Sequence, residues 1–236
     1  AVDKHDAIGG SVVVLDVRTG EVLALANYPS YSPSDRRTRT GSVLRNRSMT
    51  DTFEPGSTVK PFTIGLALQR RLVTPTTVYQ TAPGYMSVGR HRISDSSPHG
   101  PLTVSEIIQK SSNVGTVKIS EGLPAKAMWQ MYTDVGFGQK PETVFPGAAV
   151  GRLRGYDAWR TVEKATMSYG YGLSTSLFQL ARAYTVFARD GDIVPTTILK
   201  TMEPVKGTTV FSSKVAADIR NMLLLATGDE GTAPRA

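Results

Sequence analysis

The chain has 236 residues, of which 40% are apolar and 20% are charged, and these values suit a globular protein that buries a sizeable core in one large domain or two small ones. It contains no cysteine, which excludes disulfides and thiolate metal ligands, and it has no run of about 20 apolar residues to predict a membrane span. The formal net charge of +7 is compatible with an anionic partner, nucleic acid included.

The first predicted element is a β-hairpin. Residues 11–16 form an apolar, β-branched run, residues 21–26 form a second one, and residues 17–20 supply a turn that ends in glycine. The first run is so apolar that it predicts a central strand with neighbours on both edges. No later segment is clearly predicted to be a strand that pairs with this run, which indicates that strands of the sheet are missing.

An irregular connection follows over residues 28–40, where prolines, serines and arginines gather. The basic residues of this region are Arg36, Arg37, Arg39, Arg45 and Arg47. No aromatic residue interleaves them and no nucleic-acid-binding motif surrounds them, so a solvated loop or a surface for an anionic substrate is favoured over nucleic acid. The three histidines lack ligand-like spacing. We therefore expect no nucleic acid, no metal and no cofactor.

The first chemical motif lies in residues 54–62. Ser57 and Lys60 stand three residues apart at the start of a helix that is apolar nearly all round and is therefore predicted to be buried. Gly56 gives a flexible approach, and Pro61 is compatible with the first turn, where it gives up only an amide without an intrahelical partner. The spacing puts both side chains on one face with Cβ atoms roughly 5–6 Å apart, within reach for a hydroxyl nucleophile and an amine base.

For Lys60 to accept a proton, its pKa must fall well below the ordinary value of about 10.4. Burial disfavours the ammonium form, and the positive end of the helix dipole disfavours it further. The same amide-rich helix end stabilises negative charge on the serine oxygen and on the acyl group that it attacks. The motif alone is weak evidence, because an N-cap serine followed by a solvated lysine has the same letters.

Residues 72–101 are predicted to be loop with a small hairpin near residues 84–93. A helix is predicted over residues 102–110, where Thr103 and Glu106 form a capping-box pattern. Ser111 and Asn113 flank one residue in the short turn before the next predicted helix. Such a turn can aim both side chains the same way. The alternative is a polar turn that only caps the helix that follows.

The rest of the chain is predicted to be mostly helical. The pattern predicts an amphipathic helix over 125–135, loop over 137–159, an irregular stretch over 168–175 and a helix over 176–188 with an apolar, core-facing stripe. A short strand is expected at residues 210–211. Ser213 is then expected to cap a last helix over 214–226.

Two motifs together indicate a family. Ser57-x-x-Lys60, followed about fifty residues later by Lys110-Ser111-Ser112-Asn113, resembles the S-x-x-K and S-x-N motifs of the penicillin-binding transpeptidases. The segments that extend the resemblance to the class B, division-specific branch are residues 1–3, 16–24, 45–47 and 169–173. The resemblance covers nearly the whole chain. It implies an α+β penicillin-binding and serine β-lactamase-like transpeptidase fold, with residues 1–236 as one domain.

The resemblance implies a serine acyl-enzyme mechanism for a peptidoglycan D,D-transpeptidase. Ser57 attacks the carbonyl of a D-Ala-D-Ala bond, and Lys60 takes the serine proton. Ser111 relays a proton to the leaving amine, and Asn113 binds the substrate amide. The amine of a second stem peptide then attacks the acyl-enzyme and forms a cross-link. β-Lactams acylate the same serine and stay attached.

One family motif is absent, since no Lys-Thr/Ser-Gly follows Asn113. In the family this motif lies on a strand that lines the site, provides the second oxyanion amide and holds the substrate carboxylate. We therefore expect a C-terminally truncated domain in which the N-terminal hairpin is present and the C-terminal strands of the antiparallel sheet are absent. Because loss of one oxyanion donor costs about 3–4 kcal/mol, we expect the isolated chain to be nearly inert toward penicillin.

The resemblance also implies septal wall synthesis at the periplasmic face of the bacterial inner membrane, with an anchoring N-terminal helix that this chain does not contain. The implied partners are stem peptides ending in D-Ala-D-Ala, β-lactam antibiotics, a membrane SEDS-family glycosyltransferase and other division proteins. Two alternatives stay open. One is a serine β-lactamase or D,D-carboxypeptidase, which the lack of an E-x-x-x-N loop of the class A kind disfavours. The other is a non-catalytic fragment that acts as a binding scaffold.

Overall fold

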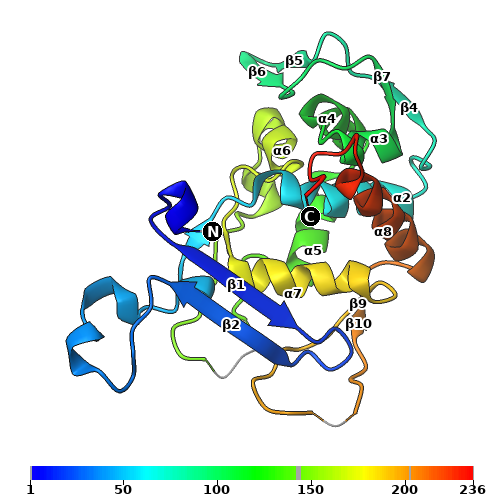
Figure 1. Cartoon of the computed structure of the whole chain (residues 1–236). Coiled ribbons are helices and arrows are strands. Elements are labelled where there is room, and N and C mark those ends of the chain that lie inside the picture. Colours follow the sequence, from blue (N-terminus) through cyan, green and yellow to red (C-terminus); the bar gives the residue numbers. More distant parts are fainter. Residues whose placement is uncertain (1, 142–144, 202, 236) are drawn as a thin grey trace.

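The computed structural model describes residues 2–141, 145–201 and 203–235 and has an α+β fold, as predicted. Figure 1 shows a group of helices with the long hairpin β1–β2 along one side, next to α7. The helices of more than four residues are α2 (Lys60–Gln69), α3 (Val104–Gln109), α4 (Asn113–Glu121), α5 (Ala125–Asp134), α6 (Thr161–Met167), α7 (Leu177–Ala188) and α8 (Ser213–Thr227).

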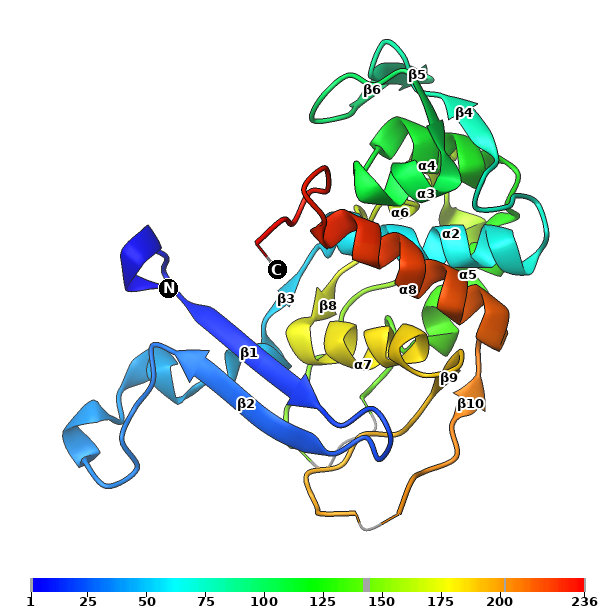
Figure 2. The same ribbon diagram turned by 45° about the vertical axis from the view of Figure 1, so that its right-hand side comes forward.

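Helix α2 lies at the centre of the helical group. It contacts α3, α4, α5 and α8, and Figure 2 shows it between the α3–α4 pair and α7. Its apolar residues point in all directions, and Phe62, Ile64 and Ala67 are each 0% exposed. Phe62 packs edge-on against Phe137 and Tyr184, with ring centroids 5.7 and 5.4 Å away. The prediction of a largely buried helix is confirmed.

The predicted N-terminal hairpin is confirmed as β1 (Gly10–Leu15) paired with β2 (Val22–Tyr28) in antiparallel register. Its turn ends at Gly20, whose φ of +77° lies in the left-handed region. A Cβ atom there would stand 2.1 Å from the carbonyl oxygen of Pro195. The turn therefore requires glycine both for its backbone conformation and for the close approach of the segment around Pro195.

The outer edge of β1 is open within the described part of the chain. There β1 pairs with β2 alone, while α7 packs against it. Val12 and Val14 are 57% and 43% exposed. The sequence predicts that this apolar run has a second neighbour and that strands of the sheet are missing. The structure agrees with this prediction, because among the described residues no strand pairs with the outer edge of β1.

The other strands are short. They pair as β3 (Thr52–Phe53) with β8 (Thr175–Ser176), β4 (Val78–Gln80) with β7 (Pro101–Thr103), β5 (Tyr85–Val88) with β6 (His91–Ser94), and β9 (Asp192–Ile193) with β10 (Thr208–Thr209). The predicted small hairpin near residues 84–93 is confirmed as β5–β6. Residues 101–103 form β7, so α3 begins two residues later than the predicted helix. The capping box of Thr103 and Glu106 at its start is confirmed.

Two predicted boundaries near the last helix are wrong. Residues 210–211 are not a strand, because both of their amides donate to the carbonyl oxygen of Gly191, at 2.8 and 2.9 Å, and follow β10 instead. The cap of α8 is Ser212 and not Ser213. Its hydroxyl accepts a hydrogen bond from the amide of Val215 at 3.3 Å.

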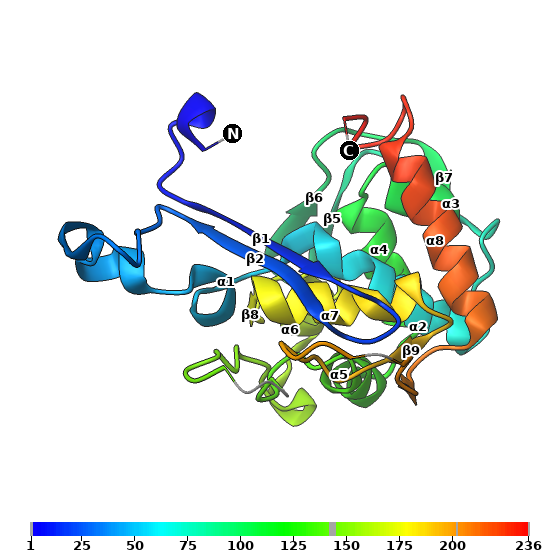
Figure 3. The same cartoon turned by 60° about the horizontal axis from the view of Figure 1, so that its bottom comes forward.

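The predicted loops are largely irregular. The segment after β2 contains two 3-10 turns, η2 (Arg36–Thr38) and η3 (Gly41–Leu44), before the short α1 (Arg47–Thr50). Figure 3 shows it extending away from the helices, which exposes its arginines to solvent. In the predicted loop 137–159, residues 142–144 lie outside the described residues, and η5 (Tyr156–Ala158) is a single 3-10 turn.

Candidate active site

Ser57 lies in the 3-10 turn η4 (Gly56–Val59), which runs directly into α2. The chain reaches it through Gly56, whose φ is +57° and whose amide donates to the carbonyl oxygen of Gly170 at 3.1 Å. A Cβ atom on Gly170 would stand 2.0 Å from the carbonyl oxygen of Gly56. Glu54 Oε1 accepts from the amide of Gly172 at 2.8 Å. The glycine-rich stretch before α7 therefore fixes the backbone that presents Ser57.

The Ser57 side chain is exposed, and its hydroxyl forms no hydrogen bond with another described residue. The carbonyl oxygen of Ser57 accepts from the amide of Lys60, which sets the two residues one turn apart. At this spacing the two Cβ atoms are roughly 5–6 Å apart on one face. The hydroxyl is thus open to a substrate and lies on the same face as the amine.

Lys60 is buried, with only 2% of its surface exposed. Its Nζ donates to the hydroxyl oxygen of Ser111 at 2.9 Å and also to the carbonyl oxygen of the same residue. Burial lowers the pKa of Lys60 from 10.5 to about 7, and the charge of Asp95 opposes this shift. Near neutral pH a large share of the amine is therefore unprotonated and able to accept a proton.

The two serines in the turn between α3 and α4 have different hydrogen-bond partners. Ser111 has φ of +56°, a left-handed conformation that side chains rarely adopt, and both of its oxygens face Lys60. Ser112 caps α4, with its hydroxyl accepting from the amide of Gly115 at 2.9 Å. The alternative of a polar capping turn is therefore correct for Ser112, while Ser111 is directed to the amine.

Asn113 is the first residue of α4 and is partly exposed. Its side-chain Nδ2 donates to the carbonyl oxygen of Ser94, at the end of β6, at 2.8 Å. An asparagine amide has a second N–H and an acceptor oxygen, so this bond leaves groups that can bind a peptide amide. The structure therefore brings Lys60 and Ser111 into direct contact and places Asn113 two residues further along the same turn.

Sequence reasoning missed Asp95. Its carboxylate accepts from the hydroxyl of Ser112 at 2.8 Å and from the amides of Asn113 and Val114 at 2.5 and 2.9 Å. The residues it binds lie 17 to 19 positions away in the chain. No motif marks that distance, and only the packing of the β5–β6 hairpin against α4 reveals it.

A buried hydrogen-bond network joins α2 to α5 and to the end of α6. The hydroxyl oxygens of Thr63 and Tyr132 lie 2.9 Å apart, and each lies 2.8 Å from a carbonyl oxygen, that of Ser168 for Thr63 and that of Met167 for Tyr132. The two hydroxyl protons are therefore shared among three contacts. Burial raises the pKa of Tyr132 above its ordinary value, so this phenol stays neutral. The network ties the helix that carries Lys60 to the C-terminal end of α6.

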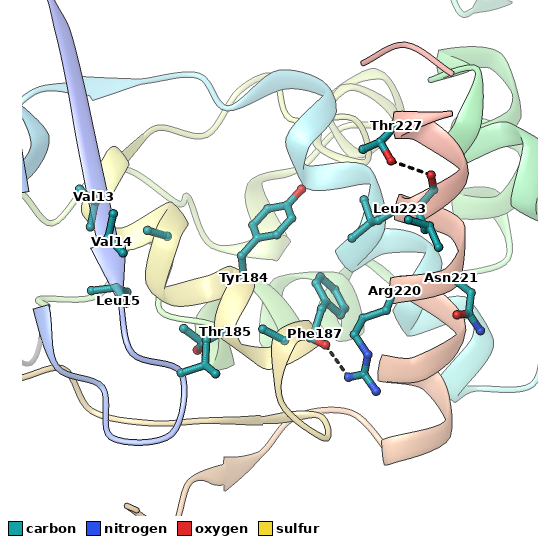
Figure 4. Close-up of a pocket in the computed structure, with 14 residues that line it drawn as sticks. Val13, Val14, Leu15, Tyr184, Thr185, Phe187, Arg220, Asn221, Leu223 and Thr227 are labelled. Carbon is teal, nitrogen blue, oxygen red and sulfur yellow. Dashed lines mark hydrogen bonds between the residues drawn. The ribbon is translucent and has the colours of Figure 1, made fainter. Parts of the chain in front are cut away.

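An apolar groove lies apart from these polar residues, between β1, α7 and α8. It has a volume of 840 Å³. Figure 4 shows Val13, Val14 and Leu15 on one side and Leu223 on the other, with Tyr184 between them. The groove runs along the open edge of β1 and contains none of the residues that the motifs single out.

Comparisons with known proteins identify a family. A model of the penicillin-binding protein transpeptidase domain matches residues 10–236. Over 232 residues the chain is 43% identical to the probable peptidoglycan D,D-transpeptidase PenA of Neisseria flavescens, covering 98% of this chain and 58% of that protein. It is 39% identical over 223 residues to the peptidoglycan D,D-transpeptidase FtsI of Escherichia coli strain K12, covering 94% of this chain and 38% of the relative.

Solved structures are similar as well. A peptidoglycan glycosyltransferase from Burkholderia ambifaria matches with a TM-score of 0.91 and 50% identity, over 99% of this chain and 70% of that one. The apo transpeptidase domain of Burkholderia pseudomallei penicillin-binding protein 3 matches with a TM-score of 0.90 and 49% identity, over 99% and 66%. The chain therefore spans 58% or less of these curated relatives and about two thirds of the solved chains.

Proposed function

Because the chain belongs to the penicillin-binding protein transpeptidase domain family, we propose that it carries the nucleophile and the base of a serine-type peptidoglycan D,D-transpeptidase. The observation that carries this proposal is the buried Lys60, whose pKa falls to about 7 and whose amine contacts the Ser111 hydroxyl at 2.9 Å. Ser57, Lys60 and Ser111 then have the roles of nucleophile, base and proton relay. The relatives named as D,D-transpeptidases support the reaction class.

In the first half-reaction, the Ser57 oxygen attacks the carbonyl carbon of the penultimate D-Ala while the neutral Lys60 amine takes the hydroxyl proton. The resulting tetrahedral intermediate carries negative charge on the former carbonyl oxygen. The backbone amide of Ser57, at the start of α2, is the donor we assign to this oxyanion. The C–N bond then breaks. Lys60 returns the proton through the Ser111 hydroxyl to the leaving nitrogen, and D-Ala departs as a neutral amine.

In the second half-reaction, the amine of another stem peptide attacks the acyl-enzyme ester. The proton that this amine loses passes back to the Ser57 oxygen as the ester bond breaks, which restores the hydroxyl and leaves a new peptide bond as the cross-link. We assign the remaining hydrogen-bonding groups of Asn113 to the substrate amide. A β-lactam follows the first half-reaction alone. Its leaving nitrogen stays tethered to the acyl group and blocks the approach of the acceptor amine.

We also propose that residues 1–236 act as one transpeptidase domain unit. The larger of two buried apolar clusters among the described residues supports this, because it runs from Val59 before α2 to Met222 in α8 and includes residues of α3, α5 and α7. Helix α2, which carries Lys60, and helix α3, which precedes Ser111, therefore share a core with α8, and the site would be lost with that core.

The biological setting is part of the same proposal. We propose septal wall synthesis at the periplasmic face of a bacterial inner membrane, with a membrane SEDS-family glycosyltransferase and other division proteins as partners. The family and the relative named FtsI support this setting. None of the helices in the described ranges is long and apolar enough to cross a membrane.

The reaction is tested with a synthetic stem pentapeptide that ends in D-Ala-D-Ala, using the protein as its native gene encodes it. We expect release of D-Ala and formation of a cross-linked product when an acceptor amine is present. Ser57→Ala should abolish both. The matched control is Thr58→Ala, which removes the neighbouring hydroxyl and its hydrogen bond to the carbonyl oxygen of Pro55, and its turnover should stay near that of the parent. Turnover by a folded Ser57→Ala protein would contradict the proposal.

A further inference from the structure

Asp95 lies next to the site but has no role in the reaction steps described above. It follows β6 and lies at the start of α4, where its carboxylate accepts three hydrogen bonds. Two come from the amides of Asn113 and Val114, which have no acceptor within their own helix. A carboxylate is well placed at a helix N-terminus, because the amide-rich end favours negative charge. The third bond comes from the hydroxyl of Ser112.

These bonds fix the backbone immediately after Ser111. The left-handed conformation of Ser111, at φ of +56°, persists only where the surrounding structure holds it. The amide of Ser111 donates to Ile108 on one side at 3.1 Å, and Asp95 binds the next three residues on the other side. Without Asp95, the first turn of α4 would lose the acceptor that sets its direction relative to α3.

We propose that Asp95 is a positioning residue of the acyl-transfer site: by fixing residues 112–114, its carboxylate holds both oxygens of Ser111 against the amine of Lys60. This inference rests on the proposed roles of Ser57, Lys60 and Ser111. The hydrogen bonds of the Asp95 carboxylate go to residues that follow Ser111, and none of them goes to Ser57, Lys60 or Ser111.

The carboxylate has a second effect on the site, through its charge. Asp95 raises the pKa of Lys60, although burial is the larger cause and acts in the opposite direction. Other charged side chains on the surrounding elements are directed elsewhere. Lys110 contacts Glu230 at 3.3 Å, Lys118 donates to the carbonyl oxygen of Gln80, and Glu106 belongs to the capping box of α3. Removal of the Asp95 charge should therefore shift the Lys60 pKa downward.

The chain offers a matched control. Glu106 is also a carboxylate at a helix N-terminus, and it accepts from the amide and hydroxyl of Thr103 at 2.7 Å each. Glu106→Gln thus removes the same kind of charge from the same kind of place, but on the helix before Ser111. Asp95→Asn keeps the side-chain shape and one acceptor oxygen. Asp95→Ser is the second variant in case the amide disturbs folding, because it also removes the charge and its hydroxyl oxygen can still accept a hydrogen bond.

The first measurement follows the side-chain carbons of Lys60 by NMR as a function of pH, with Lys60→Met used to assign the signal. We expect the titration midpoint to move to lower pH in Asp95→Asn and to stay in place in Glu106→Gln. This readout does not depend on catalysis. Thermal unfolding first shows whether both Asp95 variants are folded. If the titration midpoint of Lys60 is unchanged in both folded variants, the inference is overturned, even if Ser57 proves to be the nucleophile.

The second measurement is the rate of acylation by a labelled penicillin across pH. Misplacement of a catalytic group by about 1 Å can cost roughly 100-fold in rate, so Asp95→Asn should lower the maximal rate by at least about tenfold. The acid limb of the profile should also move to lower pH, which a merely loosened fold would not produce. If the protein as its native gene encodes it takes up no penicillin, the proposed function is refuted, and the NMR titration still decides the role of Asp95. If Asp95→Asn has the acylation rate of the parent and the same acid limb in its pH profile, Asp95 is not a positioning residue.

Discussion

At the scale of single residues, Lys60 decides whether the site can work near neutral pH. It is among the largest fully buried side chains, and burial rather than a neighbouring charge lowers its pKa. Its partners are the two oxygens of Ser111, which accept from the amine in either of its protonation states. A buried amine without an ion pair is costly in its charged form, and this cost is what makes it a base.

Lys60→Met should leave the fold intact and lower the rate of acylation by several orders of magnitude. Methionine fills a similar space with an aliphatic chain, but it cannot take the Ser57 proton. Acylation by a labelled penicillin and thermal unfolding are measured together. Lys126→Met is the control, because this lysine is exposed and far along the chain in α5. If a well-folded Lys60→Met protein is acylated at the parent rate, the lysine has no part in the mechanism.

The pH dependence of acylation follows from the same residue. The reactive form of Lys60 is the neutral amine, so the rate should rise with pH through a midpoint of about 7, the value to which burial lowers the pKa. One pH step below the midpoint leaves roughly a tenth of the amine neutral, so we expect the rate at pH 6 to be about a tenth of that at pH 8. A rate that stays flat over this range would show that Lys60 does not titrate as the base.

At the scale of elements, the glycine-rich stretch before α7 is expected to control how η4 presents Ser57. Gly170 has φ of +91° and approaches the backbone of Gly56 too closely for a Cβ atom. Gly170→Ala should cost about 1 kcal/mol for the backbone and a further 1–3 kcal/mol for the overlap, and it should also slow acylation. Gly147→Ala separates the two effects, because Gly147 has φ of +75° and no atom within 4 Å of its Cβ position.

Thermal unfolding and acylation rates of both glycine variants give the comparison. Gly147→Ala should show only the backbone cost and keep the parent rate. Equal loss of stability in the two variants would mean that the contact between Gly170 and Gly56 does not hold the turn.

The elements that the sequence predicts well are those with strong local signals. The apolar run of α2, the amphipathic pattern of α5 and the capping box of Thr103 each depend on residues only a few positions apart. The sequence does not predict helix α6, because its seven residues follow an irregular loop and its N-cap is Arg160, a residue type that does not usually mark an N-cap. The pair β4–β7 is too short for a periodic signal.

The candidate site divides in the same way. Ser57 and Lys60 are neighbours within one turn, so their spacing alone predicts that they share a face. The contact between Lys60 and Ser111 joins residues 51 positions apart, and the motif resemblance, not local geometry, predicted it. Asp95 had neither kind of signal. Its role depends on how a small hairpin packs against α4, and no spacing rule encodes such packing.

At the scale of the whole molecule, the β1–β2 hairpin is the part of the described surface that we expect to promote aggregation. The edge of β1 that does not face β2 is unpaired among the described residues, and Val12 and Val14 are substantially exposed beside the apolar groove. An apolar, unpaired strand edge is a template for pairing with another chain. We therefore expect this chain, when produced alone, to self-associate as its concentration rises.

A charge on that strand should reduce the self-association. Val12→Lys is expected to delay the rise in light scattering with protein concentration, because charged edge strands resist edge-to-edge pairing. The control is Leu72→Lys, which places the same charge at another apolar residue that is 48% exposed but lies outside the hairpin. An equal benefit from both variants would assign the effect to net charge, and the β1 edge would then not be the site of association.

The central claim is that Ser57 is the acylated nucleophile. Its most direct test is mass spectrometry of the protein, as its native gene encodes it, after reaction with penicillin and proteolysis. We expect one adduct, on the peptide that contains Ser57, and none in the Ser57→Ala variant. An adduct that persists in Ser57→Ala, or one found on a different residue of the parent, would contradict this claim.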